Sequence, residues 1–352
     1  MGQYMDKVFF WLLSLTPIAI AAHFLHLSEL AVFFIAALAI IPLAKFLGEA
    51  TEELASRSGP AFGGLLNATF GNATEIIIAI FALRAGLIEV VKASLTGSII
   101  GNLLLVLGTA IMVGGVRHKK QVFNRTGTMA SASMLLLAAI ALTIPTFLSH
   151  SARSMSPDKI QSLSTTVAIF MFIVYIANLV FIFVTHKHLY TEEVGKYEAN
   201  WSLRKSLLVL LGSTVAIAFL SEMLVGAIKP AMASLGWTDL FMGTVVIAII
   251  GNAAEHFSAI VMAAKNRMDL SLQIAVGSAI QIAMFALPIL VFISLIIGKS
   301  MNLVFTPFEL AAIVLSVMLT NLVVQDGESN WLEGAQLISA YAIIAVAFYL
   351  HP

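Results

Sequence analysis

Residues 249–260 read Ile-Ile-Gly-Asn-Ala-Ala-Glu-His-Phe-Ser-Ala-Ile, so a glutamate, a histidine and an asparagine lie within a stretch apolar enough to cross a bilayer. The core of this stretch has a counterpart, because residues 71–75 read Gly-Asn-Ala-Thr-Glu and residues 251–255 read Gly-Asn-Ala-Ala-Glu. Without a gap, 11 of the 38 residues from 63 to 100 are identical to the residue 180 positions later. The chain therefore contains an internal repeat that carries one glutamate in each copy.

The composition excludes an ordinary soluble fold. Of the 352 residues, 60% are hydrophobic and 11% are charged, and the mean hydropathy is +0.98, whereas soluble domains have about 25% charged residues. The net charge is zero, which argues against a nucleic-acid partner, because binding nucleic acid needs a clustered basic surface. The chain has no cysteine, so disulfides and thiolate metal sites are excluded.

Windows of roughly 20 apolar residues indicate transmembrane helices, and the sequence contains eleven of them. They lie near residues 8–25, 29–48, 63–84, 87–114, 127–148, 160–186, 203–228, 238–264, 269–297, 306–325 and 331–350. The predicted fold is therefore an all-α polytopic membrane protein with eleven transmembrane helices.

The distribution of Lys and Arg predicts the orientation, because short cytoplasmic loops carry an excess of basic residues. If the basic loop 115–126 is cytoplasmic, 13 of the 19 Lys and Arg residues lie on the cytoplasmic side and 6 lie on the external side. This assignment predicts a multi-pass protein of the cell (plasma) membrane with a cytoplasmic N-terminus and an external C-terminus.

The two copies of the motif lie on the third and eighth expected spans. An odd separation in span number means that the two helices cross the membrane in opposite directions, so the halves are predicted to be inverted repeats. Inverted repeats with a site near the midplane are typical of secondary transporters. The predicted organisation is an extra N-terminal transmembrane helix (1–28), a first five-helix repeat (29–190), a cytoplasmic linker (191–202) and a second, inverted five-helix repeat (203–352).

Polar residues at helical spacing predict a cation site between the halves. In each motif the asparagine and the glutamate are three residues apart and share one helix face, and hydroxyl and carboxamide residues share a face on each following span. The predicted cation ligands are Asn72, Glu75, Ser98, Asn102, Asn252, Glu255, Ser278 and Gln281. All are oxygen donors, which suit Ca²⁺, and Gly71 and Gly251 are expected to loosen each helix beside its glutamate.

A structural alternative remains open for the hydroxyl and carboxamide residues, because such side chains commonly join membrane helices. This alternative does not account for the glutamates, since a carboxylate within the membrane is costly and usually marks an ion or proton path.

The motifs resemble those of the calcium/cation antiporter superfamily. Besides the paired Gly-Asn-x-x-Glu motifs, residues 97–108 read Gly-Ser-Ile-Ile-Gly-Asn-Leu-Leu-Leu-Val-Leu-Gly, and residues 277–283 read Gly-Ser-Ala-Ile-Gln-Ile-Ala. Glu255-His256 and Gln281 resemble the bacterial type of its calcium/proton exchanger branch. The resemblance implies an eleven-helix antiporter, not an enzyme, with Glu75 and Glu255 as the central cation ligands and no cofactor.

The function expected from these features is secondary active antiport of cytoplasmic Ca²⁺ against protons, by alternating access at a midplane site with two glutamates. Either two protons or one divalent cation neutralise the paired carboxylates, so occupancy by one ligand excludes the other. The alternatives are a Na⁺- or K⁺-coupled Ca²⁺ exchanger and a broader divalent-cation (Mn²⁺)/H⁺ antiporter of the same fold. The expected partners are membrane lipid and the transported ions, and the sequence leaves open whether the chain forms a homo-oligomer.

Further ionisable residues are candidates for proton coupling beside the central pair. His256 follows Glu255 directly and serves either proton handling or a structural hydrogen bond. Glu49 and Glu222 end the second and seventh spans at roughly matching places, where they either gate the site or relay protons, or instead cap helices or meet solvent. The proton-coupling candidates are Glu75, Glu255, His256, Glu49 and Glu222. A group of charged residues beside the second span is interpreted as a solvated face, with a cation-attracting mouth as the alternative; it comprises Glu52, Glu53 and Arg57.

Overall fold

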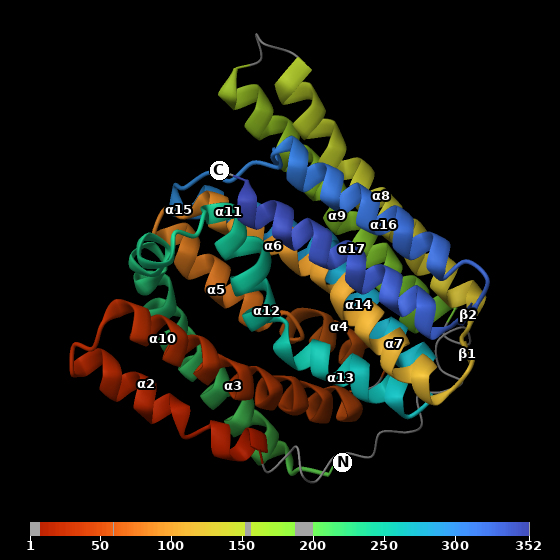
Figure 1. The fold of residues 1–352 in the computed structure, drawn as a ribbon, viewed down its shortest axis with the longest axis horizontal. Coiled ribbons are helices and arrows are strands. Elements are labelled where there is room, and N and C mark those ends of the chain that lie inside the picture. The colour runs from red at the N-terminus through yellow and green to blue at the C-terminus, as the bar shows by residue number, and fades with distance from the viewer. Residues whose placement is uncertain (1–7, 59, 152–155, 187–199, 352) are drawn as a thin grey trace.

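The computed structural model describes residues 8–58, 60–151, 156–186 and 200–351, and most of them are helical (Figure 1). Most of the expected linker, residues 191–199, lies outside the described residues. Within the described part, seven helices are long and apolar enough to cross a membrane, and one bent helix pair brings the number to eight. The prediction of an all-helical polytopic membrane protein is therefore confirmed. The helix lengths alone support seven or eight spans, and the number of eleven stays a prediction.

Helical residues nevertheless occur within each of the eleven expected windows. The helices of the first part of the chain are α2 (Leu15–Phe24), α3 (Glu29–Arg57), α4 (Pro60–Phe70), α5 (Ala73–Arg84), α6 (Ile88–Ile100), α7 (Leu107–Arg117), α8 (Arg125–Ser151) and α9 (Pro157–Val180). Those of the second part are α10 (Leu203–Leu235), α11 (Asp239–Phe241), α12 (Ala248–Gly251), α13 (Ala253–Ala264), α14 (Met268–Gln281), α15 (Leu287–Ile297), α16 (Pro307–Val323) and α17 (Trp331–Leu350). Short π-helical segments interrupt the regular helices at η1 (Gly101–Val106), η2 (Phe181–Thr185), η4 (Met242–Ile247) and η5 (Ile282–Ala286).

Two of these π-helical segments lie at matching places in the repeat. The continuous helix from α6 through η1 to α7 spans 30 residues, and so does the helix from α14 through η5 to α15. Each π segment follows the predicted hydroxyl residue of its span by three or four positions. Because π-helical turns often mark functional sites, this shared irregularity draws attention to the middle of both helices.

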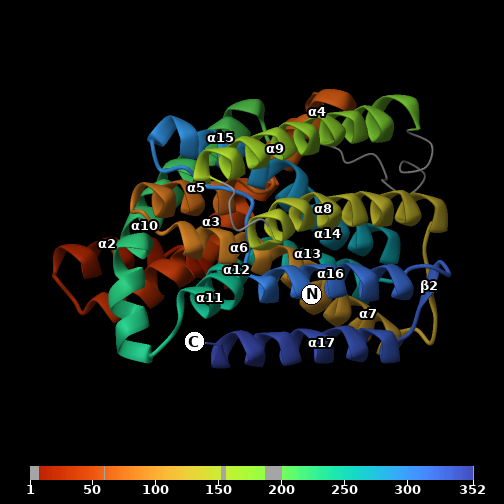
Figure 2. The same ribbon diagram turned by 90° about the horizontal axis from the view of Figure 1, so that it is seen from above.

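Long helices pack side by side around the centre. α3 lies along α10, α7 lies along α17, and α8 lies along α16, and Figure 2 shows α8, α16 and α17 running roughly parallel. A two-stranded antiparallel sheet, β1 (Gln121–Val122) with β2 (Glu328–Ser329), joins the loop after α7 to the loop after α16.

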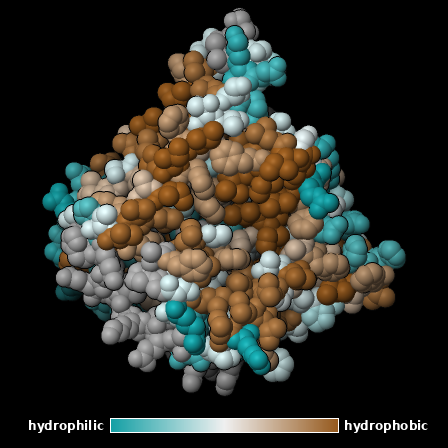
Figure 3. Space-filling view, turned by 180° about the vertical axis from the view of Figure 1, so that it is seen from behind, coloured by the Kyte–Doolittle hydropathy of each residue, from teal (hydrophilic) through white to brown (hydrophobic). Residues whose placement is uncertain are grey.

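Apolar side chains also cover much of the outer surface. Many large hydrophobic residues on α8, α9 and α10 are exposed, and Figure 3 shows a broad hydrophobic area with hydrophilic residues gathered toward its margins. This is the surface expected of helices that face lipid.

Candidate functional site

The two repeat motifs break their helices in the same way. α4 ends just before Gly71, and α5 begins after Asn72. α12 ends at Gly251, α13 begins after Asn252, and the helix axis bends by 61° at this break. The predicted loosening of both helices at their glycine–asparagine pairs is therefore present in the structure.

The carboxamides of Asn252, at the second break, and of Asn102, on η1, form the middle of a buried hydrogen-bond network. The Asn102 side-chain nitrogen donates to Asn252 Oδ1 at 3.0 Å and to Ser278 Oγ at 3.0 Å. The Asn252 side-chain nitrogen in turn donates to Ser98 Oγ at 2.7 Å and to the Ala248 carbonyl at 2.9 Å. Both asparagines have no exposed surface, so their hydrogen-bonding groups depend on one another.

The network continues to the first break. Ser278 Oγ donates to Asn72 Oδ1 at 3.5 Å, and the Asn72 side-chain nitrogen donates to Gln281 Oε1. Six of the eight predicted ligands are thus connected in one chain of hydrogen bonds, and most of these bonds join residues from the two halves of the sequence.

Glu75 lies against the second break. A Cβ atom on Gly251 would lie 3.0 Å from Glu75 Cγ, so the glycine leaves the space that the glutamate side chain fills. Glu75 is 6% exposed, and neither of its carboxylate oxygens has a hydrogen-bond partner in the described structure. Asn102 Oδ1 is also buried, and no donor among the described residues reaches it. Three acceptor oxygens at the centre therefore have no hydrogen-bond donor in this part of the chain.

Glu255 is more exposed than Glu75. Its side chain is partly exposed, although its charge lies close enough to act on Glu75. The charge of Glu52 on α3 also acts on Glu255, and Glu52 is exposed. The three carboxylates therefore interact in sequence, from the exposed Glu52 on α3 to the buried Glu75.

The interpretation of residues 52, 53 and 57 as a solvated face is wrong for Glu53. Glu53 is buried, and its carboxylate accepts the backbone N–H groups of Asn200 and Trp201 at 3.2 and 3.0 Å. Arg57 donates to the Trp201 carbonyl. These contacts fasten the end of α3 to the segment that precedes α10. Glu52 is exposed, as the interpretation of a solvated face expects, and its alternative role in a cation-attracting mouth stays a prediction.

The other proton-coupling candidates lie outside the hydrogen-bond network. Glu49 forms an ion pair with Lys45 at 2.8 Å, and Glu222 is exposed on α10. His256 is partly buried on α13, where the neighbouring Phe257 ring contacts Phe9. The structure does not bring these three side chains together.

Carboxylates and imidazoles alone do not form the centre. In the described part of the chain, no three His, Cys, Asp or Glu side chains converge on one point. A cation bound here would therefore need amide and hydroxyl oxygens beside the two carboxylates, which is the mixed oxygen set that Ca²⁺ accepts.

Sequence reasoning did not anticipate a second buried polar cluster. Lys92 on α6 is 6% exposed and donates to Asn302 Oδ1 and to the Val304 carbonyl, both at 2.9 Å. Glu309, also buried, accepts from Thr306 at the start of α16. The residue 180 positions after Lys92 is Leu272, so comparison of the repeats gives no signal for this cluster.

Comparison with known proteins identifies related chains along the whole length. A family profile described as sodium/calcium exchanger protein matches residues 28–184 and 205–350. The chain is 47% identical to a Ca²⁺/H⁺ antiporter of Aphanothece halophytica, over 99% of this chain and 97% of that protein. It is 44% identical to the Ca²⁺/H⁺ antiporter ChaA of Bacillus subtilis, over 98% of this chain and all of that protein.

Solved structures have the same fold. The structure of native YfkE superposes with a TM-score of 0.86 at 41% identity, and the match covers 97% of this chain and all of that chain. The H⁺/Ca²⁺ exchanger CAX superposes with a TM-score of 0.72 at 15% identity, over 98% of this chain and 92% of that chain. This second likeness concerns the fold alone.

Proposed function

The chain belongs to the sodium/calcium exchanger protein family, and we propose that it exchanges Ca²⁺ for protons across the membrane at the centre formed by Glu75 and Glu255. The names of its relatives support this choice of ions, since proteins 44–47% identical over nearly the full length are Ca²⁺/H⁺ antiporters. These relatives favour protons over Na⁺ or K⁺ as the coupling ion.

One structural observation carries the proposal. Both carboxylate oxygens of Glu75 and the Oδ1 atom of Asn102 are buried and have no hydrogen-bond donor in the part of the chain that the structure describes. An isolated carboxylate in a low-dielectric environment is very costly, and proteins neutralise it with a proton or a cation. The surroundings of Glu75 are therefore suited to the uptake of a positive charge.

The proposed cation ligands come from both halves. Glu75 and Glu255 supply the carboxylates, and the neighbouring hydroxyl and carboxamide groups supply neutral oxygens, together with any water that enters from the side of Glu255. The full proposed set is Asn72, Glu75, Ser98, Asn102, Asn252, Glu255, Ser278 and Gln281. Because the carboxamides already bond to one another, their oxygens are held in place before a cation arrives.

Exchange follows from competition for the same carboxylates. With both carboxylates deprotonated, a divalent cation neutralises them. When protons bind, each carboxyl group becomes neutral and loses most of its affinity for the cation, which leaves. The empty, doubly charged centre is the state least compatible with closure in a low dielectric, so the protein changes its accessible side only with cation or protons bound. The same geometry suits other hard divalent cations such as Mn²⁺.

We further propose the arrangement of spans. The extra N-terminal helix occupies residues 1–28, the first five-helix repeat 29–190, the linker 191–202 and the second, inverted repeat 203–352. Two observations support this division, namely the same break at Asn72 and Asn252 and the equal length of the helices that begin at Ile88 and Met268. Eleven spans would put the N-terminus in the cytoplasm and the C-terminus outside. Roles for His256, Glu49 and Glu222 in proton coupling stay predictions.

Transport into membrane vesicles tests the proposed function. Purified protein in vesicles should take up radioactive Ca²⁺ when a pH gradient is imposed, and Glu75→Gln or Glu255→Gln should abolish this uptake. Glu309→Gln is the matched control, because Glu309 is equally buried but bonds to Thr306 outside the network. Normal uptake in both central variants would contradict the proposal. Uptake driven by a Na⁺ gradient at uniform pH would instead favour the Na⁺-coupled alternative.

A further inference from the structure

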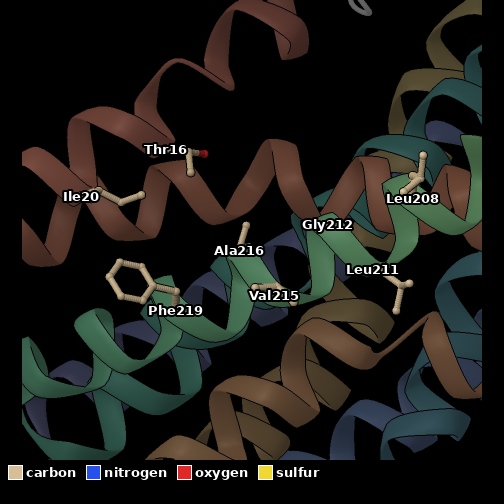
Figure 4. Close-up of a pocket in the computed structure, with 8 residues that line it drawn as sticks. All are labelled: Thr16, Ile20, Leu208, Leu211, Gly212, Val215, Ala216 and Phe219. Atoms are coloured by element: carbon tan, nitrogen blue, oxygen red, sulfur yellow. The ribbon is translucent and has the colours of Figure 1, made fainter.

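A narrow apolar groove lies between α2 and α10, away from the proposed cation centre (Figure 4). Its volume is about 570 Å³. The α10 wall includes Leu208, Leu211, Gly212, Val215 and Phe219, which recur along that helix at intervals of one to four residues and are labelled in Figure 4. The opposite wall is formed by α2.

The α10 wall is open to the membrane. Leu208, Leu211 and Val215 are 71%, 61% and 69% exposed and lie in the first half of α10. A Cβ atom added at Gly212 would meet nothing within 4 Å. The two helices therefore do not close on each other here, and hydrocarbon is the medium that fills such a gap in a bilayer.

The side of α2 adds one polar group to the groove. Thr16 lines the groove from α2 (Figure 4), and its hydroxyl oxygen is buried without a hydrogen-bond partner among the described residues. A groove filled only by packed side chains would normally satisfy this hydroxyl.

One end of the groove is cationic. Arg204 precedes Leu208 by four residues and so lies at the head of the same stripe on α10, and it is exposed. Lys205 is also exposed, and its ammonium group lies 3.9 Å from the centre of the Trp201 ring. Within the described residues, no acidic side chain pairs with Arg204 or Lys205. Basic residues beside a tryptophan at the end of an apolar helix are typical of the lipid headgroup level.

We propose that this groove is a binding site for an anionic glycerophospholipid, with the headgroup phosphate on Arg204 and Lys205 and one acyl chain between α2 and α10. The dimensions favour a chain over a protein segment. From Leu208 to Phe219 the helix rises about 16 Å, which is a suitable length for a fatty acyl chain. A helix about 10 Å in diameter with its side chains occupies about 1,250 Å³ over that length, which is more than the volume of about 570 Å³ in the groove.

The position of the groove connects lipid binding to transport. α10 packs along α3 and also contacts α5, the helix that carries Glu75. α2 lies outside the two proposed repeats and reaches the rest of the chain through α3 and α10. A lipid that fills the groove therefore fixes the distance between α2 and α10 and stabilises the arrangement described here.

Native mass spectrometry of the purified full-length chain tests the site. The probes are phosphatidylglycerol and phosphatidylcholine with identical acyl chains, titrated separately. The wild-type chain should retain one phosphatidylglycerol at a concentration about thirtyfold lower than it needs for phosphatidylcholine, since Arg204 and Lys205 near the headgroup each contribute on the order of 1 kcal/mol. Arg204→Gln should reduce that preference to about fivefold, and Arg204→Gln combined with Lys205→Gln should remove it. Gly212→Leu, which fills the groove, should weaken retention of both lipids about tenfold.

Two variants of the same helix serve as matched controls. A Cβ atom at Gly226 also meets nothing within 4 Å, and Lys229 is an exposed cation near the other end of α10, but neither residue lines the groove. Gly226→Leu and Lys229→Gln should bind both lipids as the wild type does. Equal lipid retention in Gly212→Leu and the wild type would overturn the proposal. A change from a multimer to a monomer in Gly212→Leu, with lipid retention unchanged, would overturn it in favour of a second copy of this chain.

Discussion

The two broken helices, α4–α5 and α12–α13, have nearly the same backbone at the break but different surroundings. Asn72 has φ −106° and ψ 23°, and Asn252 has φ −95° and ψ 12°. Neither asparagine uses its side chain to cap the following helix, so both side chains are available to the central network. The local geometry is thus a property of the repeated sequence.

The helix segments before the two breaks pack differently. At Gly243 on η4, a Cβ atom would lie 2.5 Å from Ala93 Cβ, and at Gly97 on α6 it would lie 2.0 Å from the Thr244 carbonyl oxygen. These two backbones therefore cross in close contact. Their counterparts in the repeat are Gly63 and Gly277, and they do not cross: Gly277 has nothing within 4 Å of its Cβ position.

Gly63 packs on a different helix, since its Cβ position lies 2.4 Å from the Ala55 carbonyl oxygen of α3. One end of the centre is therefore closed by backbone contact between α6 and η4, and the corresponding contact between α4 and α14 is not made. The exposure of the two glutamates agrees with this difference in packing, because Glu255 is partly exposed and Glu75 is buried. Two halves with one motif thus occupy different arrangements, which is what alternating access requires of an inverted repeat.

The largest expected effect concerns the closed crossing. Gly97→Ala places a methyl group against the Thr244 backbone, which cannot move without separating α6 from η4, so we expect a loss of about 3 kcal/mol in the free energy of unfolding. Gly277→Ala adds the same methyl group to open space in a helix and should stabilise the fold by up to ~1 kcal/mol. Thermal unfolding of the two purified variants measures both changes in stability. Equal melting temperatures would contradict the described difference between the crossings.

A bulkier residue at the open crossing separates stability from transport. Gly277→Leu should fold and bind Ca²⁺ normally, because nothing occupies that space in this arrangement. It should slow exchange about tenfold or more, since alternating access would bring Gly63 of α4 against α14. Uptake into vesicles and equilibrium Ca²⁺ binding, compared on the same preparation, test this. Unimpaired uptake would show that α4 never closes on α14.

The fit between Gly251 and Glu75 is the next contact to disturb. Gly251→Ala puts a methyl group 3.0 Å from Glu75 Cγ, so the carboxylate must move by a few tenths of an ångström. We expect Ca²⁺ affinity to fall about tenfold, because ligand oxygens of a cation site must keep their distances within ±0.2 Å. Gly101→Ala is the control, as its Cβ position is empty. Isothermal titration calorimetry measures the Ca²⁺ affinity of both variants. Identical affinities would show that Glu75 is not a ligand of the cation.

The smallest effect is expected from the hydroxyl groups. Ser98→Ala removes the acceptor of Asn252, but the same amide still donates to the Ala248 carbonyl. Loss of one hydrogen bond costs about 1 kcal/mol, so Ca²⁺ affinity should fall roughly fivefold. Ser278→Ala should behave similarly, because Ser278 accepts from Asn102 at the matching place. A much larger loss in one of the two variants would show that the halves contribute unequally.

The sequence predicted the breaks and most of the network for a physical reason. Glycine and asparagine disfavour a regular helix locally, and helical spacing decides which side chains share a face, so neither property depends on distant residues. The sequence placed carboxamide and hydroxyl residues of both halves at one centre, but it did not predict that Asn72 meets Gln281 or that Asn252 meets Ser98. The resemblance to a known family pointed to Glu75 and Glu255.

Other features depend on tertiary contacts that spacing does not encode. Glu53 looked like part of a charged, solvated turn, yet it is buried by the segment at Asn200 that returns from far along the chain. Lys92 is buried through contacts with a loop 210 residues away. A free-energy difference between two arrangements of the same fold decides which of the two glycine crossings is closed. This difference is small, so no local sequence pattern predicts it.

The central claim is that protons and Ca²⁺ bind alternately to the same carboxylates. The most direct test measures proton release while Ca²⁺ is added to the purified protein in weakly buffered solution, at a pH where the carboxyl groups are protonated. Competition predicts about two protons released per Ca²⁺ bound, and an apparent affinity that falls as the pH is lowered. In Glu75→Gln the release should drop by about one proton, with weaker binding. Binding of Ca²⁺ with full affinity and no proton release would contradict the account.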